Sequence, residues 1–509
     1  MRRTRPSLVL LWIAAALSVG QAVALVTWYW PGAMPDTNTS GVWIALADDF
    51  AHGALYRPLQ GALGFGGTRY MPLFIVLHGL LMKAGIGALP AGVILTLTSA
   101  GLMVTALGFL LRTLGIPRSI AWPAAVLLLG LVSVEMLLLT VRGDFLAVAF
   151  DLFGVAAAVR WSRRGGLAWL AATAAAFAGA FLTKLTTVFG LAAAAAWSWR
   201  GGRRGRAAAL AGLSAGLMLA GTLLAVLASD GRMIASFRAV ADGGIGWATA
   251  AELPLRILDA FGGDPLLWIL VVPALIAWQR ILRDDPAGLP ALLLAGTTAV
   301  TLFIFASPGT ASNHLFDLDA LAILGISLAY VRHPRLRGWL GTGFGVFALG
   351  IAISWLPGVP SIRAFFGRFH RPEVASVQDH FSRGGPRAHP VLATNPLIPI
   401  LAGERPFVAD AFNFRIMLER DPVLHAEFCG QVRAGRFGSV VLSNWPGIFP
   451  RDVESPDDPL IGQCLPAFIE LGTLGEGFTP ALLERYRIVR VHRPYIYFMR
   501  REDPPDAGT

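Results

Sequence analysis

The fold is decided by a stretch in which long apolar runs alternate with two kinds of connection. Residues 90–164 read PAGVILTLTSAGLMVTALGFLLRTLGIPRSIAWPAAVLLLGLVSVEMLLLTVRGDFLAVAFDLFGVAAAVRWSRR. The connections at 112–118 and 160–164 are basic, whereas the one between them, Arg142-Gly143-Asp144, carries an acid. Basic loops are retained on the cytoplasmic side of a membrane. The alternation therefore predicts membrane-spanning helices with the acidic connection on the outer face.

The composition agrees with a polytopic membrane protein. The chain has 509 residues, of which 55% are hydrophobic and only 15% charged, a balance outside the range of ordinary soluble domains. The net charge of +10 would suit a nucleic-acid partner. The arginines fall mostly in tight clusters between apolar runs, however, where cytoplasmic retention explains them. Nucleic-acid binding is therefore disfavoured.

Apolar segments of spanning length recur along the first 360 residues. The first follows Arg2, Arg3 and Arg5, which predicts a cytoplasmic N-terminus. It is long, ends at Trp28-Tyr29-Trp30 and has no evident cleavage site, which favours an uncleaved span over a signal peptide. About eleven spans are predicted, at 8–28, 90–111, 119–140, 145–160, 167–183, 186–199, 207–229, 264–281, 288–306, 314–331 and 338–357.

The apolar stretch 72–89 is predicted not to span. If it crossed the membrane, every later loop would change sides and the basic clusters would no longer share one face. Pro72, His78 and Lys83 interrupt the stretch, which favours a helix lying in or re-entering the outer interface. An odd number of spans then places everything after the last one in the periplasm or an equivalent exoplasmic space.

The C-terminal part, 360–509, differs in composition from the rest. It is richer in Pro and charged residues, and its short apolar runs predict a small α/β exoplasmic domain after a transmembrane domain at 1–359. Strands are expected at 391–394, 407–409, 439–443 and 495–500, and helices at 422–434 and 480–486. Its two cysteines, Cys429 and Cys464, are compatible with a disulfide or with free thiols.

The predicted outer connections hold the unusual polar residues. The first exoplasmic loop, 29–89, contains Asp36 and then an amphipathic helix at 42–52, read as interfacial, with Asp48 and Asp49 on its solvated face. Ionisable groups at membrane depth are costly, so a polar site on this face is the favoured interpretation. Further polar residues fall on the same face, namely Tyr56, Arg69, Tyr70, Arg142, Asp144, Lys184, Asn313 and His314.

The order of these residues resembles the GT-C superfamily of polyprenyl-phosphate-dependent glycosyltransferases. It is similar in particular to bacterial relatives of protein O-mannosyltransferases and aminoarabinose transferases. The resemblance rests on Asp36, Tyr70-x-Pro72-Leu73, Arg142-x-Asp144 and Thr183-Lys184 and covers about 1–360. It implies a GT-C-like layout of about eleven spans in a bacterial inner (plasma) membrane. The acidic pair usual in the family's first loop is replaced here by a lone Asp36, which leaves the base open.

Asp36 is the first candidate for the catalytic base. A transferase that attacks an anomeric carbon needs a carboxylate within reach of the acceptor hydroxyl; a helix cap is the alternative for this residue. Asp144 is the second catalytic carboxylate, or a solvated acid neutralised by Arg142. No cofactor is certain, but the resemblance allows a divalent cation, Mg²⁺ or Mn²⁺, shared by Asp36 and Asp144.

A lipid-phosphate leaving group needs fixed cations. The resemblance implies a phosphate-binding role for Lys184, for which snorkelling to the interface is the alternative, with Arg142 and Arg69 as helpers. Asn313 and His314 are candidates to bind sugar hydroxyls or to cap a helix. Tyr56 and Tyr70, and less strongly Asp48 and Asp49, complete the candidate substrate-binding set.

These features predict a membrane glycosyltransferase that moves a single sugar from a polyprenyl-phosphate donor to an exoplasmic glycan, lipid or protein acceptor. Inversion at the anomeric carbon is implied by the resemblance alone. A transporter or flippase of a lipid-linked saccharide is the main alternative, although the sequence shows no inverted repeat. A non-catalytic membrane assembly factor is the third hypothesis, and it predicts that Asp36 is dispensable.

Overall fold

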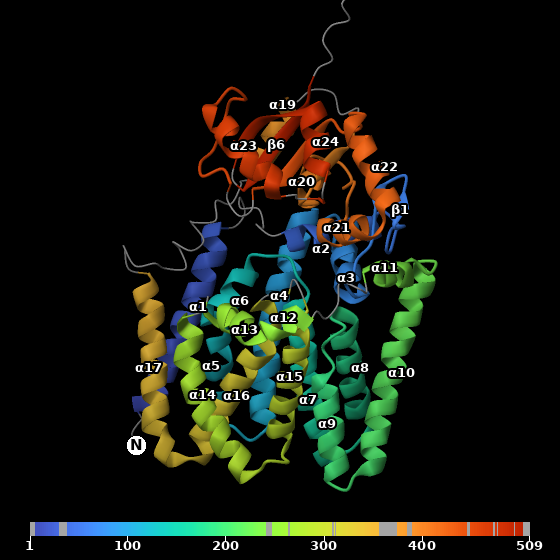
Figure 1. The fold of residues 1–509 in the computed structure, drawn as a ribbon. Helices are drawn as coiled ribbons and strands as arrows, with labels where there is room; N and C mark the ends of the chain where they lie inside the picture. The colour runs from blue at the N-terminus through green and yellow to red at the C-terminus, as the bar shows by residue number, and fades with distance from the viewer. Residues whose placement is uncertain are drawn as a thin grey trace, which may run out of the picture.

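The protein forms a helical half with an α/β unit seated on one end of it (Figure 1). The computed structural model describes residues 6–29, 38–240, 247–262, 265–307, 310, 312–355, 374–383, 389–444, 448–471, 474–475, 477–492 and 494–501. Helix α1 (Pro6–Tyr29) begins at the end of the helical half that lies away from the α/β unit. This is the arrangement expected if the first span starts on the cytoplasmic side.

The helices of the helical half follow the predicted apolar runs closely. Five of them are long and apolar enough to cross a membrane, or six if the bent pair α5 and α6 counts as one span. The protein is therefore an integral membrane protein, and the count of about eleven spans stays a prediction. The main helices are α1, α4 (Ala88–Thr113), α5 (Arg118–Val126), α6 (Val132–Leu138), α7 (Asp144–Arg164), α8 (Leu167–Thr183), α9 (Phe189–Arg200), α10 (Arg204–Ala228), α14 (Pro265–Asp284), α15 (Leu289–Phe305), α16 (Phe316–Arg332) and α17 (Arg337–Ser354).

The run predicted as one straight span at 119–140 is broken instead. A 3-10 turn, η1 (Leu127–Gly130), separates α5 from α6, and the two helices are bent by 70°. Leu131 takes an extended conformation with ψ of 134°, which interrupts the helical hydrogen-bond ladder. Gly130 allows the turn to press against α1, since a Cβ there would lie 2.5 Å from the Ser18 hydroxyl oxygen.

The stretch 72–89 holds a helix too short to span. Helix α3 (Pro72–Lys83) has 12 residues, about 18 Å of helix against a hydrocarbon core of about 30 Å. It packs beside α2 (Asn38–Ala51) and α4. Three further short helices were missed by the sequence analysis, α11 (Arg232–Val240), α12 (Trp247–Ala251) and α13 (Leu253–Gly262).

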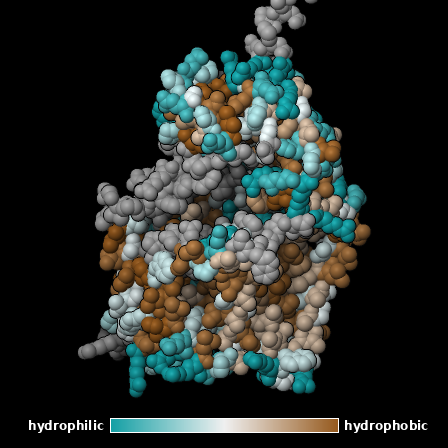
Figure 2. Space-filling model, viewed as in Figure 1, coloured by the Kyte–Doolittle hydropathy of each residue, from teal (hydrophilic) through white to brown (hydrophobic). Residues whose placement is uncertain are grey.

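The basic connections meet at one end of the helical half. Arg163 donates a hydrogen bond to the carbonyl oxygen of Thr113 (2.7 Å), and Arg206 donates one to the carbonyl oxygen of Ser162 (2.8 Å). Three basic loops thus lie together, as the positive-inside pattern requires. Figure 2 shows hydrophobic side chains over the helical half, with hydrophilic ones gathered at its far end and over the α/β unit.

The α/β unit is built on a four-stranded sheet of order β3-β4-β6-β5. Strands β3 (Val391–Ala393) and β4 (Ser439–Ser443) are parallel, whereas β6 (Tyr495–Arg500) pairs antiparallel with both β4 and β5 (Tyr486–His492). The helices around it are α19 (Val374–Arg383), α20 (Leu397–Leu401), α21 (Ala411–Arg420), α22 (Pro422–Arg433), α23 (Pro459–Leu471) and α24 (Phe478–Arg485). Cys429 and Cys464, in α22 and α23, are both free thiols.

Most predicted elements of this unit are present, but one predicted strand does not join the sheet and one observed strand, β5, was not predicted. Segment 407–409 is not a strand of the sheet. It pairs instead with the first exoplasmic loop, where Phe65 N–H donates to the Phe407 carbonyl and Ala409 N–H to that of Phe65. Strand β5 was missed because it begins directly after α24 without a turn signal, and its charged residues blur the alternation.

A buried ion cluster joins α2 and the loop that follows it to the α/β unit. Both carboxylate oxygens of Asp49 accept from Arg57, at 2.6 Å each, and one also accepts from Arg405 at 2.6 Å. Asp49 is fully buried and Asp48 is nearly so. The interpretation of these two acids as a solvated helix face was therefore wrong: the α/β unit covers that face of α2.

Candidate functional site

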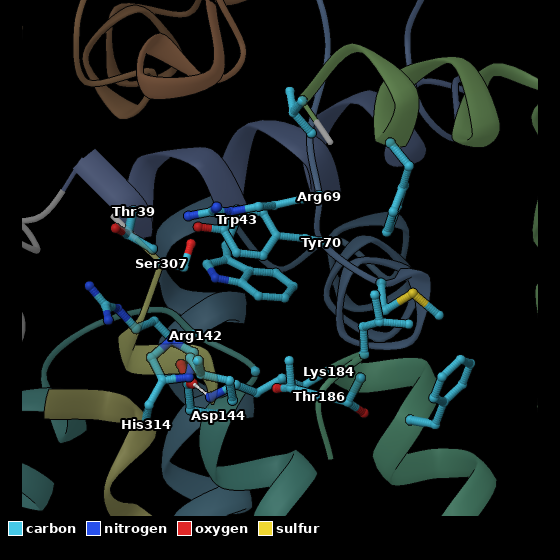
Figure 3. A pocket seen from close by; sticks show the side chains of 18 of the residues that line it. Thr39, Trp43, Arg69, Tyr70, Arg142, Asp144, Lys184, Thr186, Ser307 and His314 are labelled. Atoms are coloured by element: carbon cyan, nitrogen blue, oxygen red, sulfur yellow. Dashed lines mark hydrogen bonds and ion pairs between the residues drawn. The ribbon is translucent and has the colours of Figure 1, made fainter. Parts of the chain in front are cut away.

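A cavity of about 880 Å³ lies where the helical half meets α2 and the loop between α2 and α3 (Figure 3). Its walls come from α2, the loop before α3, the ends of α7, α8, α10 and α15, the loop before α16, and α11. The polar lining residues include Thr39, Arg69, Tyr70, Arg142, Asp144, Thr183, Lys184, Thr186, Thr222, Arg238, Ser307, Thr310, Asn313 and His314.

Asp144 is the hub of the polar end. One oxygen of its carboxylate accepts from Lys184 Nζ at 2.7 Å and from Asn313 Nδ2 at 2.9 Å. Asp144 opens α7, so its charge stands at the positive end of the helix dipole. Lys184 directly follows α8 in an extended conformation. Gly143 permits the approach of the two helix ends, because a Cβ there would lie 3.1 Å from Thr183.

Three arginines line the cavity beside this hub. Arg142 precedes Asp144 by two residues and lines the cavity. Its Nε is buried with no hydrogen-bond partner among the described residues. Figure 3 shows Arg142, Asp144, Lys184 and His314 close together, with Arg69 above them beside Tyr70. The third arginine, Arg238, lies on α11. The lining cations outnumber the one described lining acid, which suits an anionic ligand.

His314 lies against the same hub. Its Nδ1 is buried and has no hydrogen-bond partner in the part of the chain that the structure describes. A neutral imidazole can either donate or accept, so His314 can bind a hydroxyl without adding to the positive charge.

The two candidate tyrosines have different places. Tyr70 lines the cavity, and its ring lies 4.4 Å from that of Trp43, centroid to centroid; burial raises the pKa of its hydroxyl. Tyr56 does not line the cavity. It has a left-handed backbone conformation (φ 55°), and its hydroxyl donates to the Tyr70 carbonyl oxygen at 2.7 Å. Tyr56 therefore holds the loop that carries Arg69 and Tyr70.

The acidic candidates separate as well. Asp48 and Asp49 lie in the ion cluster with Arg57 and Arg405 and do not line the cavity. Asp36 lies outside the described residues, three positions before the lining residue Thr39. Among the described residues, Asp144 is the one lining acid, and no group of three His, Cys, Asp or Glu could hold a metal ion.

The remaining lining of the cavity is apolar. The sequence analysis missed these residues, because they lie on helices where an apolar side chain reads as lipid-facing or core. Arg238 was missed because it lies on α11, a helix of nine residues that is too short to register as an apolar span. The apolar lining comprises Trp43, Met71, Phe181, Leu185, Val226, Met233, Ile234, Phe237, Val240, Phe303 and Ile304.

No protein-family model and no curated protein match this chain. Solved structures do match. ArnT from Cupriavidus metallidurans, bound to undecaprenyl phosphate, is similar with a TM-score of 0.58 at 13% sequence identity, over 96% of this chain and 99% of that one. The oligosaccharyltransferase from Archaeoglobus fulgidus in the apo form is similar with a TM-score of 0.55 at 12% identity, over 94% and 72%.

A second structure from Archaeoglobus fulgidus extends the comparison. The oligosaccharyltransferase AglB, in complex with an inhibitory peptide and a dolichol-phosphate, has a TM-score of 0.51 at 13% identity, over 94% of this chain and 72% of that one. Likeness at such identities defines the fold. The chain has the GT-C fold, and the resemblance drawn from its sequence is confirmed at that level.

Proposed function

We propose that the protein is a membrane glycosyltransferase that moves one sugar from a polyprenyl-phosphate donor to an exoplasmic acceptor. The observation that carries the proposal is a cavity whose lining has both cationic and apolar side chains. Lys184, Arg142 and Arg69 line the cavity, and α10 and α11 add apolar side chains such as Val226, Met233 and Phe237. A phosphate on a long hydrocarbon chain has the same two parts.

The comparisons support this ligand class. ArnT is bound to undecaprenyl phosphate and AglB is in complex with a dolichol-phosphate, and both structures share the fold of this chain. We extend that chemistry to the present cavity because four cationic side chains line it against one described acid, and the Nε of Arg142 is buried with no hydrogen-bond partner among the described residues.

The proposed step is a displacement at the anomeric carbon, with inversion. The acceptor hydroxyl oxygen forms a bond to that carbon while the bond from the carbon to the phosphate oxygen breaks. The bonding electron pair leaves with the lipid phosphate, whose charge Lys184 and Arg142 stabilise. The acceptor proton passes to a carboxylate, for which we propose Asp36, since Asp144 is already engaged by Lys184 and Asn313.

We propose further that the basic loops are cytoplasmic and the α/β unit is periplasmic in a bacterial inner membrane. In that orientation the cavity opens toward the exoplasmic leaflet and contacts membrane lipid. The α/β unit borders the loop that lines the cavity, so it is well placed to help recognise a glycan, lipid or protein acceptor. A Mg²⁺ or Mn²⁺ ion shared by Asp36 and Asp144 remains part of the proposal.

The test is sugar transfer by purified protein in nanodiscs, with a panel of polyprenyl-phosphate sugars and an acceptor extract of bacterial envelope. Lys184→Met should abolish transfer, whereas Lys83→Met should not. Lys83 is a matched control because it is an exposed lysine at the end of α3, away from the cavity. Asp36→Asn tests the base and EDTA tests the cation. Transfer unchanged in Lys184→Met would contradict the proposal.

A further inference from the structure

The α/β unit reaches the cavity through one aromatic side chain. Phe412 is the second residue of α21, and the guanidinium carbon of Arg69 lies 5.3 Å from the centroid of its ring. Arg69 lines the cavity, whereas Phe412 is not one of the lining residues. The contact therefore joins a residue of the α/β unit to a cation of the proposed phosphate end.

Arg69 makes no hydrogen bond or ion pair within the described part of the chain. Its charge acts at longer range on Asp410, the acid closest in sequence to Phe412. That acid, Asp410, caps α21: its two carboxylate oxygens accept from the backbone N–H (3.1 Å) and the side-chain amide (2.6 Å) of Asn413. The N–H groups of Arg69 thus form no hydrogen bond with the described residues, while its guanidinium lies near an aromatic ring.

The position of Phe412 is itself fixed against the loop that carries Arg69. The backbone of Phe65 bonds to Phe407 at 2.7 Å and to Ala409 at 3.0 Å, and Arg57 donates to the carbonyl oxygen of Pro406 at 2.5 Å. Gly64 makes this approach possible, since a Cβ there would collide with the Phe407 carbonyl. The backbone segments that carry Phe412 and Arg69 are therefore joined to each other.

From this arrangement we infer that Phe412 is a positioning residue that holds Arg69 toward the donor phosphate. The inference rests on the proposed function, because it assigns the anion that Arg69 meets. Its consequence is that the α/β unit completes the donor end of the cavity, in addition to any contact with the acceptor. Removal of the ring should weaken donor binding and leave the KM for the acceptor unchanged.

A double-mutant cycle tests the inference. Binding of undecaprenyl phosphate to detergent-purified protein is measured by native mass spectrometry for wild type, Phe412→Ala, Arg69→Ala and the double variant. We expect Phe412→Ala to weaken binding about 5-fold, Phe412→Tyr to restore it, and the double variant to bind no more weakly than Arg69→Ala alone. In transfer assays the loss should appear in the donor KM and not in kcat.

Arg415 provides the matched control. Its guanidinium carbon lies 5.9 Å from the centroid of the same ring, but Arg415 does not line the cavity. Arg415→Ala should therefore leave binding unchanged. The positioning role alone would be overturned if the wild type binds the lipid phosphate and Phe412→Ala binds it equally well. Additive losses in the double variant would overturn it too. Wild-type protein that binds no lipid phosphate would overturn the proposed function, and the positioning role with it.

Discussion

Two carboxylates of this protein, Asp49 and Asp144, meet cations in opposite ways. Asp49 is fully buried and closed on all sides, with both oxygens taken by Arg57 and one also by Arg405. Asp144 lines a cavity, uses one oxygen for Lys184 and Asn313, and leaves Arg142 beside it unbonded. Pairing between a carboxylate and cations therefore joins two parts of the chain at Asp49, whereas at Asp144 it leaves positive charge available to a ligand.

The sharpest way to break this comparison is to remove the closed carboxylate. Asp49→Ala leaves two arginines, one of them fully buried, without a counter-charge. Loss of one member of a buried ion pair typically costs about 3–5 kcal/mol. We expect a large fall in the melting temperature of the detergent-purified protein, together with a poor yield.

Asp48→Ala is the neighbouring control for that prediction. Asp48 contacts Arg405 only at 3.9 Å and His52 at 3.4 Å, so its loss should lower the melting temperature much less. Equal effects of Asp48→Ala and Asp49→Ala would show that the cluster does not join the two parts of the chain as described.

Replacement of Asp144, the carboxylate that lines the cavity, should lower the transfer activity and leave the stability of the protein unchanged. In Asp144→Asn the side chain can still accept from Lys184, but the charge that orients the ammonium is gone. We expect transfer to fall about 100-fold or more, with a melting temperature close to that of wild type. Binding of undecaprenyl phosphate should be unchanged or tighter, because the cavity becomes more positive. Weaker binding in this variant would contradict the orienting role.

A third carboxylate, Asp410, lies between these two cases, since burial raises its pKa to about 6. The folded state then binds its proton more tightly than the unfolded state, whose pKa is near 3.8. Stability from this group is fully present below about pH 4 and is lost as pH rises to about 6, by up to about 3 kcal/mol. Asp410→Asn should remove that part of the pH dependence, measured as melting temperature from pH 4 to 8. A slope that persists in Asp410→Asn would refute this assignment.

The sequence could predict the open site better than the closed cluster. Asp144, Lys184 and Asn313 stand out because isolated polar residues between apolar runs are costly in a membrane, and the structure brings all three into contact. Asp49 looked solvated because its partner Arg405 is 356 positions away, and a helical period cannot reveal a covering domain. The bend at Leu131 and the strand after α24 were likewise set by tertiary packing.

The same limit explains which cavity residues were missed. Arg238 comes from α11, a helix of nine residues that is too short to register as an apolar span. Nothing in the sequence around Phe412 marks it as a functional residue. It acquires a role only because segment 406–409 is hydrogen-bonded to the loop near Arg69. Local patterns thus indicate where charge is costly, whereas contacts between distant segments decide which charges remain free.

The smallest expected effect concerns the unbonded cation itself. Arg142 has no hydrogen-bond partner for its buried Nε in the described structure, so Arg142→Gln removes charge without breaking a protein contact. We expect an increase in the donor KM of about 10-fold, the loss of one charge-assisted contact, with the melting temperature unchanged. Arg200→Gln, an exposed arginine at the end of α9 on the basic side, should leave the KM unaltered. If Arg142→Gln instead destabilised the protein as Asp49→Ala should, Arg142 would belong to a closed structural cluster, and the contrast between the two sites would fail.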